Sequence, residues 1–362
     1  MELIDLLLEM VERDASDLHL VTGMPPMLRV RGILEATHLH SDDATVLVGD
    51  EVNRLLDPHL SSKSRIALSD GCDIAQAITL NDDPAREGGG NAVRFRTCVF
   101  RDRLGVSAAL RMIPDSIPTL SQIFSQETED KFRGLLELKK GLILVVGSTG
   151  NGKSTTIASM IDAINTERCE RIFTIEDPIE YVHHSKKSVV SQREVGSDVD
   201  SFEQGGLTAL RSDPDIVLIS ELQTPESVRI AVALAETGHL VFASMQANSV
   251  SETITRLLES FPENRDTMQR MFARSFRAVV AQILLPRAGG NGRVPVHEIL
   301  LTNDEVRAMI QRGETDFTEA MSAGHSAGMC TMDDSVMTLY KSGGITRECA
   351  LDHLNDQGNM GI

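Results

Sequence analysis

The pattern of apolar and polar residues differs between the first third of the chain and the rest. Residues 16 to 21 and 27 to 31 alternate polar and apolar side chains around a Gly-Met-Pro-Pro turn, which predicts a hairpin. Later runs are continuously apolar and rich in β-branched residues, as in strands buried on both faces of a parallel sheet. The apolar runs cover 142 to 146, 171 to 175, 216 to 219, 240 to 245 and 278 to 285, and amphipathic helical stretches alternate with them. The pattern predicts a small α+β domain followed by an α/β domain with a parallel-rich, helix-covered sheet.

Other segments set the predicted domain limits. A first domain over 1–114 is completed by an amphipathic helix over the first ten residues, a helix within 44 to 57 and further strands over 73 to 78, 93 to 100 and 106 to 113. Residues 81 to 90 are polar and glycine-rich, which predicts a loop. Pro114, Pro118 and weak periodicity predict a hinge or linker over 115–133, and a second domain covers 134–362.

Capping signals predict that the end of the chain is helical. Thr302 with Glu305 forms a capping box ahead of an apolar stripe, and Gly313 suits the end of that helix. Thr331 with Asp334 marks the start of another helix.

Length, charge and cysteine content narrow the class of protein. A chain of 362 residues exceeds the size of a single core, which supports two domains. The formal net charge of −18 argues against a sequence-independent grip on nucleic acid, which needs a basic surface. The five cysteines are far apart and form no C-x-x-C pair, so neither a zinc site nor a disulfide framework is indicated. No apolar run approaches the length of a membrane span, and the first residues lack a basic signal-peptide region, so we expect a cytoplasmic protein.

One stretch matches the phosphate-loop pattern G-x-x-x-x-G-K-[ST] at every fixed position. A predicted buried strand precedes it, and an apolar stripe at helical spacing follows it. These flanks favour a nucleotide pocket over an ordinary glycine-rich turn. The predicted nucleotide-binding residues are Gly147, Ser148, Thr149, Gly150, Asn151, Gly152, Lys153, Ser154 and Thr155.

The residue types of this loop suit a triphosphate. Glycines let successive backbone N–H groups converge on the phosphates, and the following helix turns its positive dipole end toward them. Lys153 supplies a mobile charge to the β- and γ-phosphates, and the Ser154 hydroxyl can bind Mg²⁺. The loop therefore predicts ATP or GTP, together with Mg²⁺.

Carboxylates follow two of the predicted buried strands. Glu221 follows the run 216 to 219, where a P-loop ATPase needs a group near Mg²⁺ and the attacking water, so it is the candidate general base. The alternative is that Glu221 only caps the next helix. Glu176, Asp177 and Glu180 close another strand and form a candidate Mg²⁺ site, with Glu176 also a candidate catalytic residue. The alternative is a solvated acidic turn.

Histidine and arginine add weaker signals. His239 stands at the start of an apolar strand, where it either senses the γ-phosphate or is a half-buried imidazole with a local partner. Arg96, Arg103 and Arg111 belong to an arginine-rich stretch of an acidic protein. They are candidate phosphate ligands from the first domain, and a solvated strand face is the alternative.

Taken together, these motifs resemble the hexameric secretion ATPases, and within them the PilT-like, twitching-motility group of type IV pilus retraction motors. The resemblance covers nearly the whole chain. It rests on ASDLHL at 15 to 20, RFR at 94 to 96, the loop at 147 to 155, TIEDPIE at 174 to 180, SQREV at 191 to 195, DPD at 213 to 215 and AETGHLVF at 235 to 242.

The resemblance implies a PAS-like amino-terminal domain hinged to a RecA-like ATPase domain, with ATP and Mg²⁺ bound between them in a homo-hexameric ring. It implies an inner-membrane platform protein of a pilus or secretion system as partner, with sister motor ATPases as candidate partners. No direct nucleic-acid partner is expected, and the protein would reach the inner membrane only through a partner.

The resemblance also implies roles for single residues. Glu176, Asp177 and Glu180 match an aspartate box. Glu221 matches the Walker B acid, and His239 matches the first histidine of a histidine box. The arginines match phosphate-sensing arginines, although Arg103 is offset by one position.

Three departures from the family pattern matter for function. Gln223 and Thr224 stand where the family has an arginine and an aspartate, and Gln246 stands where it has a second histidine. The leading hypothesis is a motor that powers pilus retraction, which the absence of a four-cysteine zinc motif favours over assembly. The departures motivate an alternative, a slow or non-hydrolysing ATP-binding paralogue that modulates an active motor. A nucleic-acid translocase is the least favoured of the three hypotheses.

Overall fold

The computed structural model describes residues 2–38, 46–48, 50–80, 93–113, 116–290 and 292–354. The chain divides into two compact units, each with its own sheet and core. Unit 1 consists of Met1–Ser116 with two later segments, Pro178–Val182 and Glu194–Asp198. Unit 2 consists of the remaining residues.

Unit 1 is built on an antiparallel sheet with strand order β3-β2-β1-β6-β5-β4. Helix α1 buries Leu3, Leu6 and Met10, because its apolar residues recur at helical spacing along one face. The predicted hairpin is confirmed as β1 paired with β2. The elements described are α1 (Leu3–Glu12), β1 (Ala15–Val21), β2 (Met27–Val30), β3 (Ile33–Ala36), α2 (Glu51–Leu56), α3 (Ser62–Ser69), β4 (Ile74–Leu80), β5 (Val93–Asp102) and β6 (Gly105–Ile113).

Unit 2 is built on a sheet with strand order β13-β12-β7-β11-β10-β8-β9. Strands β12, β7, β11, β10 and β8 are parallel to one another, and β13 is antiparallel to β12. The carboxyl ends of the parallel strands meet at one edge, where α/β folds bind ligands. The strands are β7 (Gly141–Val146), β8 (Arg171–Glu176), β9 (Val189–Glu194), β10 (Ile216–Ile219), β11 (Leu240–Met245), β12 (Phe276–Pro286) and β13 (Arg293–Leu301).

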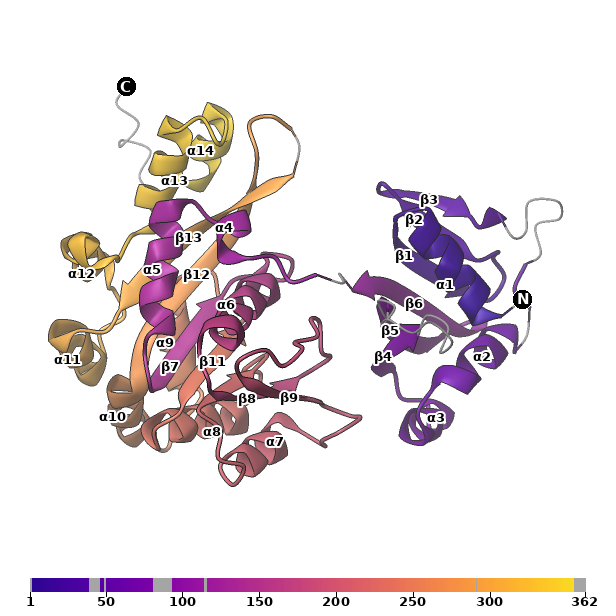
Figure 1. Cartoon of the computed structure of the whole chain (residues 1–362), viewed down its shortest axis with the longest axis horizontal. Helices are drawn as coiled ribbons and strands as arrows, with labels where there is room; N and C mark the ends of the chain where they lie inside the picture. The colour runs from indigo at the N-terminus through magenta and orange to yellow at the C-terminus, as the bar shows by residue number, and fades with distance from the viewer. Residues whose placement is uncertain are drawn as a thin grey trace. The chain divides into compact units, whose positions relative to one another are not determined.

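Helices pack against this sheet, as Figure 1 shows. Helices α6 and α8 contact β7 and β11, α7 contacts β8 and β10, and α9 contacts the long β12–β13 hairpin. The predicted α/β fold with a parallel-rich sheet is confirmed. The helices are α4 (Leu120–Ile123), α5 (Gln126–Leu136), α6 (Lys153–Glu167), α7 (Phe202–Ala209), α8 (Pro225–Glu236), α9 (Val250–Glu259), α10 (Arg265–Ser275), α11 (Asp304–Arg312), α12 (Thr318–Ala323), α13 (Met332–Lys341) and α14 (Arg347–His353).

The segment predicted as a linker, 115–133, is largely helical. It contains α4 and most of α5, and from residue 117 onward it belongs to unit 2. Leu120, Phe124 and Phe132 are buried in the core of that unit, with the two phenylalanine rings stacked at 4.6 Å. A few large apolar side chains thus anchor a segment whose composition is otherwise polar. The predicted loop at 81 to 90 lies outside the described residues.

Near the carboxyl-terminal helices, one prediction is wrong and one strand was missed. Asn303, not Thr302, caps α11, and its side chain accepts a hydrogen bond from the backbone N–H of Val306. The sequence pattern also missed β13, whose proline and polar residues interrupt the apolar run. The predicted helix end at Gly313 and the capping box of Thr331 are confirmed.

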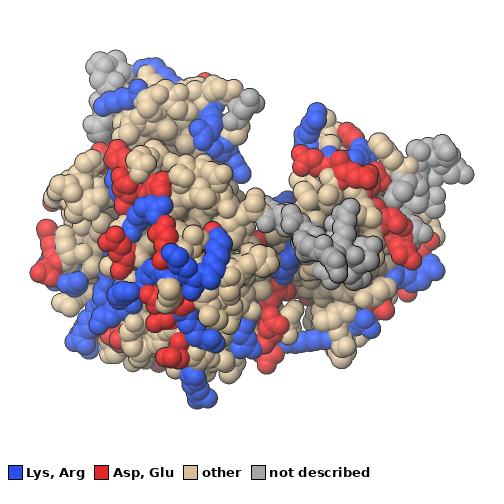
Figure 2. Space-filling view, in the orientation of Figure 1, with Lys and Arg blue, Asp and Glu red and all other residues tan. Residues whose placement is uncertain are grey.

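Charges of both signs share the visible surface. On the face shown in Figure 2, Lys and Arg side chains are interspersed with Asp and Glu across unit 2. The described residues on this face therefore do not form one continuous basic surface of the kind that non-specific nucleic-acid binding requires. Among the described helices, none combines the length and the apolar content that a bilayer crossing demands.

Candidate functional site

The predicted phosphate loop connects β7 to α6 in unit 2. Every residue of β7 is buried, and α6 begins at Lys153 and buries its apolar face. Gly152 precedes the helix with φ of 76°, a left-handed conformation that glycine adopts without strain. A Cβ atom at Gly147 would collide with the carbonyl oxygen of Gln282 on β12. The loop therefore lies directly against the neighbouring strand and requires glycine at 147.

The side chains of the loop are ordered by bonds within it. Lys153 Nζ donates to the carbonyl oxygens of Gly147 at 2.8 Å and Ser148 at 3.2 Å. Asn151 Nδ2 donates to Ser148 Oγ at 2.8 Å. Ser154 is exposed in the first turn of α6. Because an ammonium group and a helix N-terminus meet at one glycine-rich loop, the residues present fit a phosphate-bearing ligand. The exposed Ser154 hydroxyl offers one oxygen to a metal ion that accompanies the phosphates.

A buried polar network supports the loop from behind. Gln282 Nε2 donates to the carbonyl oxygen of Asn151 at 2.6 Å. Gln282 Oε1 accepts from the Thr156 hydroxyl at 2.8 Å and bonds to His297 Nε2 at 2.9 Å. Gln282 and His297 face each other across the β12–β13 ladder. Thr156, Gln282 and His297 are 1%, 2% and 4% exposed, so water cannot replace these bonds.

His297 takes part in this network as a neutral ring. Burial, with a contribution from Lys131, lowers the pKa of His297 from 6.5 to about 3. Nε2 of the neutral ring faces the amide oxygen of Gln282. Nε2 therefore carries the ring's hydrogen and donates the hydrogen bond. The ring lies edge-on to Phe124 at 5.2 Å and Phe132 at 5.4 Å. This network was not predicted from the sequence, where its one signal was a lone glutamine inside the apolar run 278 to 285.

Glu221 directly follows β10 in the same sheet. Strands β10 and β7 flank β11, so Glu221 and the phosphate loop lie at the same edge. The loop after β10 is tied to β11, because Leu222 N–H donates to Ser244 O at 2.8 Å and Ser244 Oγ donates to Ser220 O at 2.5 Å. Thr224, rather than Glu221, caps helix α8. The structure therefore does not support the alternative that Glu221 is a helix cap.

Both oxygens of the Glu221 carboxylate accept hydrogen bonds from glutamine amides. Gln223 Nε2 donates to Oε2 at 2.8 Å, and Gln246 Nε2 donates to Oε1 at 2.9 Å. A cavity of about 290 Å³ is lined by Glu221, by both glutamines and by Arg256, among other residues. In the sequence, Gln223 and Gln246 stand out only as departures from the family pattern, whereas in the structure both contact the candidate base.

The three predicted acidic residues after β8 have different surroundings. Glu176 is buried, and its Oε1 accepts from the Thr174 hydroxyl at 2.7 Å and from Gln192 Nε2 at 2.9 Å. Asp177 is exposed, and Glu180 belongs to unit 1. Within the described ranges, no group of three His, Cys, Asp or Glu side chains is arranged to hold a metal ion. The structure thus does not assemble these three carboxylates into one cluster, and each one's role toward Mg²⁺ stays a prediction.

His239 lies at the opposite edge of the sheet from the phosphate loop. It precedes β11, and its carbonyl oxygen accepts from the N–H of Gly141 at the start of β7. The length of β7 separates these positions by about 20 Å. The His239 ring bonds through Nδ1 to the carbonyl oxygen of Leu234 at 2.9 Å. This placement supports the local-partner interpretation and gives no support to contact with a nucleotide in the same chain's loop.

The predicted phosphate-binding arginines belong to unit 1. Arg111 pairs with Asp17 at 2.7 Å, and Arg96 pairs with Glu180 at 3.3 Å. Burial alone would raise the pKa of Asp17, but hydrogen bonds from Arg111 and Ser16 outweigh it and lower that pKa. Arg103 is exposed in the turn after β5. The roles of these arginines toward a nucleotide stay predictions.

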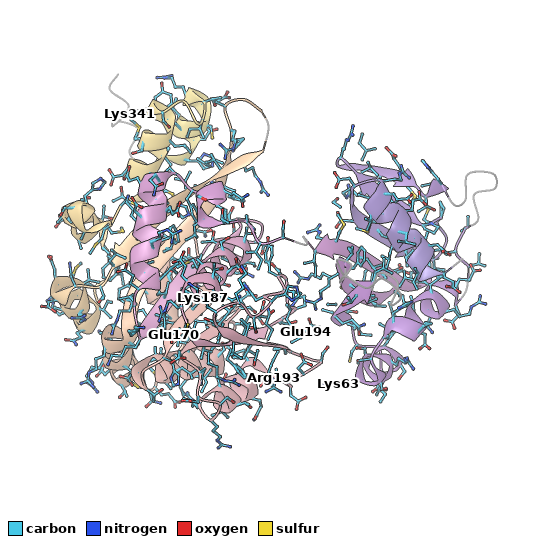
Figure 3. All side chains as sticks on the ribbon, in the orientation of Figure 1. Lys63, Glu170, Lys187, Arg193, Glu194 and Lys341 are labelled. Atoms are coloured by element: carbon cyan, nitrogen blue, oxygen red, sulfur yellow. The ribbon has the colours of Figure 1, made fainter. Side chains whose placement is uncertain are left out.

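A second ion pair ties the late segments of unit 1 to its sheet. Glu194, labelled in Figure 3, ends β9 and lies 3.5 Å from Arg94 on β5. Its Oε2 also accepts from the N–H of Ile179 at 3.1 Å. Arg94 of the motif at 94 to 96 thus meets Glu194 of the motif at 191 to 195 inside this unit.

Comparisons with known proteins give one consistent result. The family model of type II/IV secretion system proteins matches residues 3–337. The type IV pilus retraction ATPase PilT of Pseudomonas aeruginosa is 37% identical over 352 residues, with 97% of both chains covered. The type IV pilus ATPase PilU of the same organism is 36% identical, covering 99% of this chain and 90% of its own. A crystal structure of the pilus retraction motor PilT with bound ADP has a TM-score of 0.84 at 37% identity, over 99% of this chain and 98% of that one.

Proposed function

Because the chain belongs to the family of type II/IV secretion system proteins, we propose that it is an ATP-hydrolysing motor that powers type IV pilus retraction, or a related secretion filament. The observation that carries this proposal is the phosphate loop and Glu221 at one edge of one parallel sheet. Relatives named as a retraction ATPase and a retraction motor with bound ADP support it. Retraction is favoured over secretion because the chain covers 97% of the retraction ATPase, against 72% of a type II secretion protein E of Klebsiella pneumoniae.

The phosphate loop is the proposed ATP site. Its backbone N–H groups and the N-terminus of α6 bind the phosphates, and Lys153 leaves its own loop carbonyls to pair with them. Ser154 would hold Mg²⁺, with Glu176 and Asp177 as further candidate ligands. When bound, Mg²⁺ neutralises phosphate charge. Gly147 keeps the loop close to β12, so the site keeps its shape before nucleotide arrives.

Glu221 is the proposed general base. A water attacks the γ-phosphorus, its proton passes to the Glu221 carboxylate, and the bond to the β–γ bridging oxygen breaks. The products are ADP and inorganic phosphate, and the proton on Glu221 returns to solvent. The partly exposed carboxylate at the edge of the sheet has access to water for both transfers.

Assembly and partners form a further part of the proposal. We infer a homo-hexameric ring in which Arg96, Arg103 and Arg111 of unit 1 contribute to phosphate binding. His239 would act away from its own chain's phosphate loop. The ring would work in the cytoplasm, at the inner membrane, through a platform protein of the pilus or secretion system. Sister motor ATPases are candidate ring partners.

One specific observation supports a second candidate function, that of a slow paralogue which modulates an active motor. Gln223 and Gln246 replace charged or titratable family residues and contact the candidate base directly. A slow ATP-binding paralogue that modulates an active motor would carry such replacements.

Steady-state ATPase activity of the purified protein separates the two functions. We expect turnover that falls by about 100-fold or more in both Lys153→Ala and Glu221→Gln, with nucleotide binding lost only in the first. A wild-type rate no higher than that of Glu221→Gln would reject the motor and favour the modulating paralogue. Stimulation of the rate by DNA or RNA at modest salt would instead favour a nucleic-acid translocase.

A further inference from the structure

Two glutamines hold the Glu221 carboxylate from two different elements. Gln223 lies in the loop after β10, and Gln246 follows β11. Each donates its amide N–H to a different carboxylate oxygen, at 2.8 and 2.9 Å. Two bonds to two oxygens restrict both the rotation and the tilt of the carboxylate plane.

The backbone behind the glutamines is itself fixed. The loop after β10 is bonded to β11 through Leu222 and Ser244. On the other side, the Arg256 guanidinium donates to the carbonyl oxygen of Gln246, and Arg256 also pairs with Glu252 one turn earlier on α9 at 3.4 Å. The two amides are therefore presented from anchored backbone, although the side chains themselves are exposed.

Neutral amides are suited to orienting a base. An ionised carboxylate has about four lone-pair positions, and two amide bonds leave about one free on each oxygen to accept from water. A glutamine amide carries no charge and gives up no proton at neutral pH, so it does not compete for the proton that the base accepts. The adjoining cavity of about 290 Å³ has room for several waters, each of which occupies about 30 Å³.

We propose that Gln223 and Gln246 are positioning residues that orient the Glu221 carboxylate for proton abstraction from the attacking water. This inference rests on the proposed function and concerns the hydrolysis step alone. The two replacements then support turnover in this chain, at positions where the family has an arginine and a histidine. Loss of either amide lowers kcat and leaves nucleotide affinity unchanged.

The test uses methionine, which keeps the length of glutamine and removes its donor. In the full-length protein, Gln246→Met and Gln223→Met should each lower kcat about three- to tenfold, the worth of one hydrogen bond. The dissociation constant of a fluorescent ADP analogue should stay within about twofold. Gln246→His, which restores an N–H donor, should keep a higher kcat than Gln246→Met. Gln204→Met, at an exposed position of helix α7, is the matched control, with no expected effect.

Variants made in the Glu221→Gln background distinguish a wrong assignment of the base from a wrong assignment of the positioning residues. There, adding Gln246→Met should cause no further loss of rate, because no carboxylate is left to orient. Glu221→Gln with wild-type activity would overturn the base assignment, and the positioning role with it. An inactive Glu221→Gln together with fully active methionine variants would overturn the positioning role alone. A methionine effect that persists in the Glu221→Gln background, or that appears as weaker nucleotide binding, would also overturn it.

Discussion

The phosphate loop and the candidate base are supported in opposite ways. The loop rests on Gln282, Thr156 and His297, all within a few per cent of complete burial. Glu221 is held by two glutamines that are exposed to solvent. Buried polar groups lose their bonds at high cost, whereas exposed ones exchange them with water at little cost. Nucleotide binding is thus tied to the stability of the domain, while turnover can be changed by substitutions that the fold tolerates.

The largest effect should come from the buried support. Gln282→Met leaves the Thr156 hydroxyl and the His297 N–H without partners, which should cost about 3 kcal/mol or more of unfolding free energy. Nucleotide affinity should fall as well, since the Asn151 carbonyl also loses its donor. Urea unfolding and nucleotide titration measure the two effects, with Gln204→Met as control. A Gln282→Met protein with normal stability and normal nucleotide affinity would contradict the distinction between the phosphate loop and the Glu221 region.

Gly147→Ala tests the close approach of the loop to β12. The added Cβ meets the Gln282 carbonyl oxygen, so loop or strand must move, at about 1 to 3 kcal/mol. We expect nucleotide binding to weaken about tenfold or more in a fluorescence titration. Gly134→Ala on α5, where a Cβ has open space, should bind as the wild type does. Equal affinity of the two variants would show that the loop is less tightly constrained than its contacts indicate.

Acid should weaken the buried network. The pKa of His297 is about 3 in the folded protein and about 6.5 when unfolded, so the unfolded state binds the proton first. The stabilisation is complete above pH 6.5 and is lost as pH falls toward 3, at about 1.4 kcal/mol per pH unit. His297→Gln keeps a donor and does not titrate, so its unfolding free energy should depend less steeply on pH between 6 and 4.5. His183, with a pKa lowered to about 4 by burial, adds a slope of the same sign in both proteins.

The smallest effect should appear at the exposed glutamines. The double variant Gln223→Met and Gln246→Met should change the free energy of unfolding by less than about 0.5 kcal/mol. The same variant should show the largest reduction in kcat among the methionine variants. A marked loss of stability in urea would mean that this region, too, is coupled to the core.

The sequence predicts local features well and long-range pairs poorly. Strand, loop and helix around Lys153 are neighbours along the chain, so periodicity and glycine placement identified all three. The contact between Thr156 and Gln282 joins residues 126 positions apart, and it depends on the register of β12 on β7, which no local pattern encodes. His297 was missed for a further reason, since β13 itself was not predicted. The partners of Glu221 were visible only as departures, because their meaning depends on two strand ends lying side by side.

The distance in sequence between the phosphate loop and its buried support has a consequence for protein synthesis. Gln282 is translated 131 residues after Asn151, which at ordinary elongation rates means roughly 7 to 26 seconds later. During that interval the nascent loop has its glycines and its lysine but not the β12–β13 hairpin that holds them in place. The nucleotide pocket therefore takes its final shape late, and a newly made chain that holds nucleotide tightly is one whose domain has finished folding.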